Sequence, residues 1–362
     1  MSERGALIAD FLAGAGLADA RRDPLPGDAS TRRYERLTTP SGGRLMLMDQ
    51  APALESPPCD PAWTPEERRA HGWNATARLS AGRIEAFAAV AQHLRAAGLS
   101  APEVVALDAA NGLAILEDLG DDLYARVIER GADELPLYLE AVEALARLHM
   151  TATLPDRLEG PGGNWPLLTY DATALQAGAD LFIDWMPKLE PSLDFGAEAR
   201  AEWLAAWAPV AAMGEARARV MAHRDYHAEN LLWLPGREGF RRVGLIDFQD
   251  AVLAHPVWDL HSLLQDARRD VSPEVERAAL DHYIDIMQVD GEAYRADYAA
   301  LAALNEARIL GVFARLIARD GKSRYRQFMP RMWRHLEQNL KRPELSQVAV
   351  WFDRHVPKER RG

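Results

Sequence analysis

The chain has 362 residues, enough for two structural units that each bury a core, and its 48% hydrophobic and 27% charged content is typical of a globular protein. A net charge of −12 argues against binding to nucleic acid or to an anionic lipid surface. With one cysteine, no apolar run near the roughly eighteen residues of a membrane span and no signal-like N-terminus, we expect a cytoplasmic protein without a disulfide or a membrane partner.

The first third of the chain predicts an antiparallel sheet with one inserted helix. A short amphipathic helix is expected over residues 7–12, and strands at 34–37, 44–48, 104–107 and 113–116, with turn residues between them. Apolar residues at spacings of three and four predict a helix over 84–99. Residues 51–82 are rich in proline, glycine, serine and charge, so we expect a long mobile insertion there.

A change of composition at residues 117–120 predicts a hinge between one unit over 1–117 and a second over 118–362. The second unit is expected to be mostly helical, with helices over 139–150, 165–185, 197–207, 275–287, 301–318 and 328–340. This unit contains a cluster of aromatic residues, namely Trp165, Tyr170, Phe182, Trp185, Trp203 and Trp207. Aromatic residues at helical spacing more often belong to a core than to a binding site, although a sugar ring could stack on one of them. The fold class is therefore α+β.

The most specific pattern in the chain is an H-x-D-x-x-x-x-N motif over residues 223–230, followed by a hairpin and the sequence Leu-Ile-Asp-Phe at 245–248. Apolar runs at 231–234 and 243–246 flank a turn, so Asn230 and Asp247 are expected at facing ends of one hairpin. This order of groups is typical of phosphoryl transfer, which needs a positioned nucleophile and a metal-bound triphosphate. The alternative is a surface turn in which Asp and Asn cap backbone groups.

Within this motif, Asp225 is the predicted general base, which accepts or orients the proton of the substrate hydroxyl. Asn230 and Asp247 are the predicted ligands of Mg²⁺, a hard ion that takes oxygen donors. We expect the His223 side chain to support the loop by hydrogen bonding. Asp259 is expected either to cap a helix or to accept hydrogen bonds that brace the loop.

Two further residues of the motif, His227 and Glu229, lie beside the predicted base. They could contact the substrate, and exposure to solvent is an equal interpretation.

The phosphate-binding groups are less clear. The loop at 27–33 contains small residues, among them Ser30 and Thr31, whose backbone N–H groups could approach phosphate oxygens, although a plain hairpin is equally consistent. The first lysine is Lys188, so the strand at 44–48 lacks the lysine that kinases place there. Any cation in this part of the chain is an arginine or a charged histidine, and Arg32, Arg33 or Arg44 could substitute. We favour Arg32 and Arg33 because they adjoin the loop.

These motifs resemble the aminoglycoside phosphotransferase family, which has a protein-kinase-like fold, and the resemblance spans nearly the whole chain. It rests on the 223–247 motif and on the segments 27–34, 116–120, 245–250 and 310–322. The resemblance implies two lobes, a sheet-rich N-terminal lobe with one helix and a larger, mostly helical C-terminal lobe, with ATP and Mg²⁺ between them. Within the family, the same segments look like bacterial kinases that phosphorylate N-acetylmuramate and N-acetylglucosamine at the anomeric hydroxyl during peptidoglycan recycling.

The resemblance also implies site residues. Adenine would meet the hinge at Glu117 and Leu119, with Leu232 and Ile246 as apolar lining. The partner would be a small-molecule amino sugar, and no protein partner is predicted. A lactyl carboxylate on that sugar would need a cation, and Arg308 and Arg315 are candidates on one helix.

Two other functions stay open. A kinase of the aminoglycoside, choline or homoserine type would keep the catalytic set and change the pocket in the helical lobe. Many acidic residues there would favour a cationic substrate, whereas a pair of arginines would favour an acidic sugar. The missing strand lysine also leaves open a non-catalytic binding module of the pseudokinase type.

Overall fold

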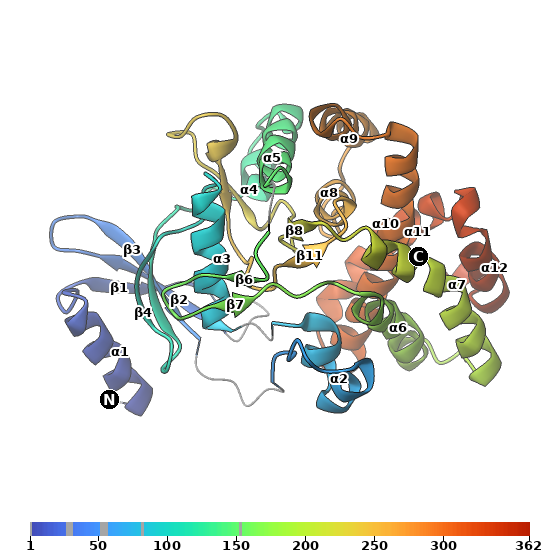
Figure 1. Ribbon diagram of the computed structural model, residues 1–362, viewed down its shortest axis with the longest axis horizontal. Helices are drawn as coiled ribbons and strands as arrows, with labels where there is room; N and C mark the ends of the chain where they lie inside the picture. The colour runs from blue at the N-terminus through green and yellow to red at the C-terminus, as the bar shows by residue number, and fades with distance from the viewer. Residues whose placement is uncertain (1, 27–31, 51–56, 81–82, 152–153) are drawn as a thin grey trace.

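The computed structural model describes residues 2–26, 32–50, 57–80, 83–151 and 154–362. Its N-terminal part is a five-stranded antiparallel sheet with strand order β1-β2-β3-β5-β4, flanked by helices (Figure 1). The elements are α1 (Glu3–Gly14), β1 (Arg21–Pro24), β2 (Arg33–Thr38), β3 (Arg44–Asp49), α2 (Pro65–His71), the π-helical turn η1 (Asn74–Arg78), α3 (Ile84–Ala96), β4 (Val104–Asp108) and β5 (Leu113–Glu117).

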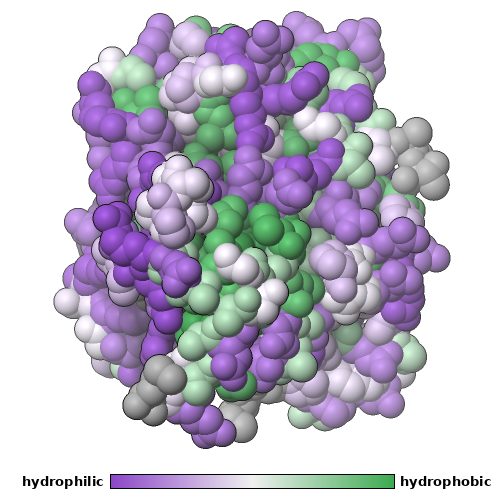
Figure 2. All heavy atoms as spheres, turned by 90° about the vertical axis from the view of Figure 1, so that its left-hand side faces the viewer, coloured by the Kyte–Doolittle hydropathy of each residue, from purple (hydrophilic) through white to green (hydrophobic). Residues whose placement is uncertain are grey.

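The alternation of side chains along the strands gives this sheet two apolar faces. On one face, Leu47 and Ile115 pack with Ile8 of α1 in a small core. On the other face, Met48 and Leu116 belong to the main core of the molecule, which also includes α3. Figure 2 shows the end of the molecule that carries α1 and the sheet, where hydrophilic residues surround a hydrophobic area near the centre.

The C-terminal part is mostly helical (Figure 1). None of the helices in the described residues is both long and apolar enough to span a membrane. The elements are α4 (Tyr124–Glu129), α5 (Glu134–His149), β6 (Arg157–Leu158), β7 (Trp165–Pro166), α6 (Ala172–Leu189), α7 (Ala197–Ala216), β8 (Val220–Ala222), β9 (Leu231–Trp233), η2 (Gly239–Arg242), β10 (Val243–Leu245), β11 (Val252–Ala254), α8 (Val257–Leu264), α9 (Pro273–Met287), α10 (Gly291–Ala318), η3 (Ser323–Phe328), α11 (Met329–Asn339), η4 (Pro343–Leu345), α12 (Ser346–His355) and η5 (Lys358–Arg360).

The long helix α10 packs along α6, and the approach of the two backbones depends on a glycine. A Cβ atom at Gly311 would lie 2.3 Å from the carbonyl carbon of Leu181. Beside this contact the ring of Phe182 stacks on Trp203, with 5.5 Å between ring centroids, and both side chains are fully buried. Phe182, Trp203 and Trp207 of α6 and α7 therefore belong to the core, whereas Trp185 is half-buried.

The structure confirms the predicted α+β class, the antiparallel sheet, the helix after residue 84 and the hairpin that follows the motif. Several boundaries were wrong. The helix expected over 165–185 begins only at Ala172, because residues 165–166 pair with β6, and α10 begins at Gly291, ten residues before the predicted start. Helix α12 and strands β1 and β11 were not predicted at all.

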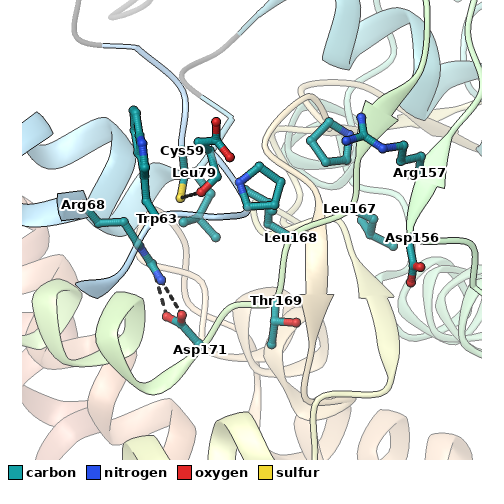
Figure 3. Close-up of a pocket in the computed structure, with 13 residues that line it drawn as sticks. Cys59, Trp63, Arg68, Leu79, Asp156, Arg157, Leu167, Leu168, Thr169 and Asp171 are labelled. Carbon is teal, nitrogen blue, oxygen red and sulfur yellow. Dashed lines mark hydrogen bonds and ion pairs between the residues drawn. The ribbon is translucent and has the colours of Figure 1, made fainter. Parts of the chain in front are cut away.

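The prediction of a mobile insertion is wrong for the described residues 57–80. Thr64 caps α2 through a capping box with Glu67, and the buried Arg68 pairs with Asp171. Figure 3 shows this ion pair at the edge of a pocket that the insertion forms with residues 156–171. The polar composition was misleading because Glu67 stabilises the start of a helix and Arg68 is buried against a distant residue.

Candidate active site

The motif 223–230 is a loop between two short strands, and its position follows from their pairing. Strand β8 pairs with β11, and β9 pairs with β10 so that Leu231 lies opposite Leu245. This register puts Asn230 beside the residue that precedes Asp247. Asp225, Asn230 and Asp247 line one pocket of about 340 Å³, which we call the acidic pocket; its other lining residues are Leu123, Arg126, His227, Glu229 and Arg268.

A buried carboxylate braces the loop. Asp259, in the first turn of α8, accepts hydrogen bonds from the backbone N–H groups of His223 (2.6 Å) and Arg224 (2.8 Å). Burial raises the pKa of Asp259 to about 7, although the two amide donors favour its ionised form. Arg224 has a φ of +77°, a conformation that such bracing must hold in place.

Of the two roles expected of Asp259, bracing the loop is confirmed, and capping the helix is wrong because Pro256 is the N-cap of α8. The hydrogen-bonding role expected of the His223 side chain is also wrong. Both ring nitrogens of His223 are buried and make no hydrogen bond to any residue that the structure describes. Its ring packs edge-on against Tyr226 and Phe248 instead. Burial lowers the pKa of His223, so the ring is an uncharged packing group.

The predicted metal ligands present suitable oxygen atoms. The Asn230 side-chain nitrogen donates to the backbone oxygen of Asp225 at 2.9 Å, which leaves the amide oxygen available. The Asp247 carboxylate is 42% exposed and accepts a hydrogen bond from Gln249 at 3.1 Å. Over the described residues no group of three or more His, Cys, Asp or Glu side chains could hold a metal, so water and phosphate oxygens would complete the coordination of Mg²⁺.

Of the arginines considered for the phosphates, the structure brings Arg32 to this site. The Arg32 guanidinium is almost fully buried, 3.0 Å from Asp247 and hydrogen-bonded to Gln249 at 2.8 Å. Arg33, the next residue, is exposed, and Arg44 pairs with Asp118 at 3.0 Å. The predicted contacts Ser30 and Thr31 lie outside the described residues.

Two of the residues expected to meet adenine lie in the predicted hinge at 117–120, and the other two lie in or beside the hairpin after the motif. Glu117 ends β5, and its carboxylate pairs with Arg237 and Arg95, so that side chain is committed to ion pairs. Leu119 is half-buried. Leu232 is buried in β9, where it pairs with Leu123 of the segment after the hinge, and the half-buried Ile246 directly precedes Asp247.

Asp225 also lines a second pocket of about 450 Å³, which has the opposite charge and which we call the cationic pocket. Arg308 and Arg315, the predicted substrate residues of α10, lie in it. Five arginines face two aspartates there; the lining comprises Trp73, Asn74, Arg78, Arg224, Asp225, Asp250, Arg308, Arg315 and Arg319.

The other two predicted substrate residues, His227 and Glu229, lie in the acidic pocket. Glu229 pairs with Arg268 at 2.9 Å, and Arg268 contacts His227 Nε2 at 3.1 Å. Burial and the charge of Arg268 hold the pKa of His227 well below its usual range, so its ring accepts a hydrogen bond as a neutral group.

Sequence reasoning missed the insertion as part of this site. Trp73 and Arg78 line the cationic pocket, and Arg224 donates to the backbone oxygens of Ala77 (3.0 Å) and Arg78 (2.7 Å). Arg78 and Ser80 also contact the Asp250 carboxylate. Two tryptophans, Trp63 and Trp73, within this otherwise polar stretch were an available signal.

Comparisons with known proteins show the family and the fold of the chain. Residues 22–304 match the family model described as the phosphotransferase enzyme family. The N-acetylmuramate/N-acetylglucosamine kinase of Caulobacter vibrioides is 55% identical over 361 residues, which cover 99% of each chain. Choline kinase from Cryptosporidium parvum has a similar fold, with a TM-score of 0.58 at 10% identity over 96% of this chain and 99% of that one. An ADP-bound aminoglycoside phosphotransferase gives a TM-score of 0.50 at 14% identity over 92% and 94%.

Proposed function

Because this chain belongs to the phosphotransferase enzyme family, we propose that it is an ATP-dependent sugar kinase that phosphorylates the anomeric hydroxyl of N-acetylmuramate and N-acetylglucosamine. The curated relative from Caulobacter vibrioides bears the name of both sugars and is similar over nearly the full length of both chains. The product would serve peptidoglycan recycling.

One observation carries the proposal: Asp225 lies where an acidic pocket and a cationic pocket meet. A kinase needs its base between the bound nucleotide and the acceptor hydroxyl. The acidic pocket contains Asn230 and Asp247, whose oxygens suit a metal ion. The cationic pocket also contains Asp225 and suits an acceptor that carries negative charge.

On the nucleotide side, the residues fit Mg²⁺ and ATP. Asn230 and Asp247 would hold the ion, and Arg32 would supply positive charge to the phosphates in place of the strand lysine. Mg²⁺-ATP, when bound, supplies the phosphoryl group and neutralises its charge. A structural neighbour, an aminoglycoside phosphotransferase, is ADP-bound, which supports an adenine nucleotide as the phosphoryl donor.

On the acceptor side, Asp225 takes or orients the proton of the sugar hydroxyl, which frees an oxygen lone pair to attack phosphorus. Asp259 keeps the loop that carries Asp225 in position through the two backbone hydrogen bonds. The fold is also compatible with a choline kinase or an aminoglycoside kinase, but choline and aminoglycosides are cations. Five arginines in the acceptor pocket disfavour them.

The remaining elements of the proposal follow from the chemistry. An ATP-dependent enzyme acting on an amino sugar needs no macromolecular partner. Because such an enzyme requires ATP and Mg²⁺, a cytoplasmic location is favoured.

The test is ATP consumption by the purified protein with N-acetylmuramate, N-acetylglucosamine, choline and an aminoglycoside, with ³¹P and ¹H NMR of each product to locate the phosphate. Both sugars should be phosphorylated at C1. Asp225→Asn should lower kcat by about 10²- to 10⁴-fold, whereas Asp184→Asn, which alters a half-exposed carboxylate of α6, should not. Turnover of choline or the aminoglycoside without turnover of either sugar would reject the proposal.

A further inference from the structure

We propose that Arg315, with Arg308 beside it, binds the lactyl carboxylate of N-acetylmuramate and sets the preference between the two sugars. The inference rests on the proposed function. N-acetylmuramate differs from N-acetylglucosamine by a 3-O-lactyl group, which adds one carboxylate. A residue that recognises this carboxylate must lie in the acceptor pocket, carry positive charge and lack an acidic partner of its own.

Arg315 meets these conditions. Its guanidinium makes no ion pair with any described residue, and its Nε is buried without a hydrogen-bond partner among them. Two other arginines of the pocket differ, since Arg78 pairs with Asp250 at 2.8 Å and Arg319 with Asp320 at 2.6 Å. A buried donor left unpaired is costly, so a carboxylate that reaches Arg315 replaces an unfavourable state by a charge-assisted hydrogen bond.

The electrostatic environment points the same way. Burial, together with the charges of Arg319 and Arg308, lowers the pKa of Arg315, whereas Asp320 opposes that shift. A guanidinium surrounded by like charge gains more from an incoming anion than an isolated one does.

Arg308 is held in place next to Arg315. The two residues are seven positions apart on α10, which places them on one face of the helix, and both line the cationic pocket. The Arg308 stem lies over Gly178 of α6, where a Cβ would be 3.1 Å from its Cδ. Its guanidinium donates to the side-chain oxygen of Asn305 at 3.0 Å and makes no ion pair with the described residues.

The insertion forms the opposite wall. The Trp73 ring lies against the Arg315 guanidinium, 5.7 Å from ring centroid to Cζ. The bonds from Arg224 to the backbone of Ala77 and Arg78 hold this wall against the catalytic loop. Because Arg224 directly precedes Asp225, the wall that receives the lactyl group is fixed relative to the base.

The first test compares kcat/KM for the two sugars in the wild-type enzyme and in Arg315→Gln. Removing one partner of a desolvated charge pair costs at least about 2 kcal/mol, so the preference for N-acetylmuramate over N-acetylglucosamine should fall by about 30-fold or more. Arg308→Gln should also lower this preference, but by a smaller factor than Arg315→Gln. The matched control is Arg334→Gln, an exposed arginine of α11 paired with Asp270, which should leave the ratio unchanged.

The second test uses N-acetylmuramate methyl ester, which keeps the lactyl group and removes its charge. The wild-type enzyme should discriminate against the ester, and Arg315→Gln should lose that discrimination, so that the two changes are not additive. Phosphorylation of neither sugar by the wild-type enzyme would reject the proposed function. If the wild-type enzyme phosphorylates both sugars but Arg315→Gln lowers kcat/KM equally for both, the carboxylate site alone is rejected. The same holds if Arg315→Gln prefers the acid over the ester as strongly as the wild-type enzyme does.

Discussion

Arg32 is the proposed replacement for the lysine that kinases place on the strand corresponding to β3. Its guanidinium bonds to the side-chain oxygens of Asp247 and Gln249 at the same time. A planar guanidinium can serve two acceptors in fixed directions, whereas an ammonium is a compact point charge. A guanidinium at position 32 can therefore carry the charge that a lysine in β3 would carry.

We expect Arg32→Lys to raise KM for ATP by roughly tenfold, because a charge-assisted hydrogen bond contributes about 1.5 kcal/mol or more. Arg33→Lys is the matched control. That neighbouring side chain is exposed, and its substitution should change KM by no more than about twofold. Steady-state kinetics of the two variants decides between the neighbouring arginines, and equal effects would contradict the assignment of Arg32.

Asp259 predicts a pH dependence of stability. The folded carboxyl keeps its proton to about pH 7, whereas its ordinary pKa is 3.8, so the folded state binds more protons between these values. The contribution of this group to the free energy of unfolding is therefore fully present below about pH 4 and decreases as pH rises through 7. Denaturant titrations at several pH values give the free energy of unfolding of the wild-type protein and of Asp259→Asn. The difference, wild type minus variant, should decrease as pH rises. A difference that grows with pH would contradict it.

At the scale of elements, the C-terminal part depends on the crossing of α6 and α10. Gly311 lets the backbones touch, and Gly178 of α6 accommodates the Arg308 stem at the same interface. This contact places the arginines of α10 opposite the insertion, so the packing of the two helices also shapes the cationic pocket.

Gly311→Ala should destabilise the protein by about 3 kcal/mol, since its methyl group would meet the backbone of α6, which cannot move without separating the helices. Gly291→Ala is a control on the same helix. Its nearest atom, in Ile284, would be 3.5 Å away, and a helical glycine replaced without strain should give a gain of about 0.5 kcal/mol. Chemical denaturation measures both, and equal stability of the two variants would refute the close-packing argument.

At the scale of the whole molecule, the bond between Arg32 and Asp247 joins the sheet-bearing part to the helical part. The hinge side is joined by other pairs, Glu117–Arg237 among them. A nucleotide bound between these links would contact both parts and should stabilise the fold as a unit.

Thermal unfolding with ADP and Mg²⁺ should reveal this linkage. A ligand at one hundred times its Kd adds about 2.7 kcal/mol to the free energy of unfolding, so Tm should rise, and EDTA should remove the part that depends on the ion. Asp247→Asn should keep the response to ADP alone and lose the response to Mg²⁺. A full Mg²⁺ response in that variant would contradict the proposed ligand.

The sequence by itself determined the α+β class, most of the long helices and the catalytic motif with its hairpin. These features are local, because spacing along the chain fixes which side chains share a helix face or meet across a tight turn. The 223–230 motif and Asp247 are seventeen residues apart at the nearest point and joined by one hairpin. Their proximity could therefore be inferred without knowing the rest of the fold.

Tertiary structure alone decided which arginine reaches Asp247 and what the insertion does. Arg68 bonds to Asp171 across 103 positions, and Arg78 to Asp250 across 172. No local pattern encodes such pairs, since they depend on how α6, α10 and the insertion pack together. The same packing brought Trp73, Arg308 and Arg315 to one pocket beside Asp225, and so gave the predicted phosphoryl-transfer site its cationic acceptor side.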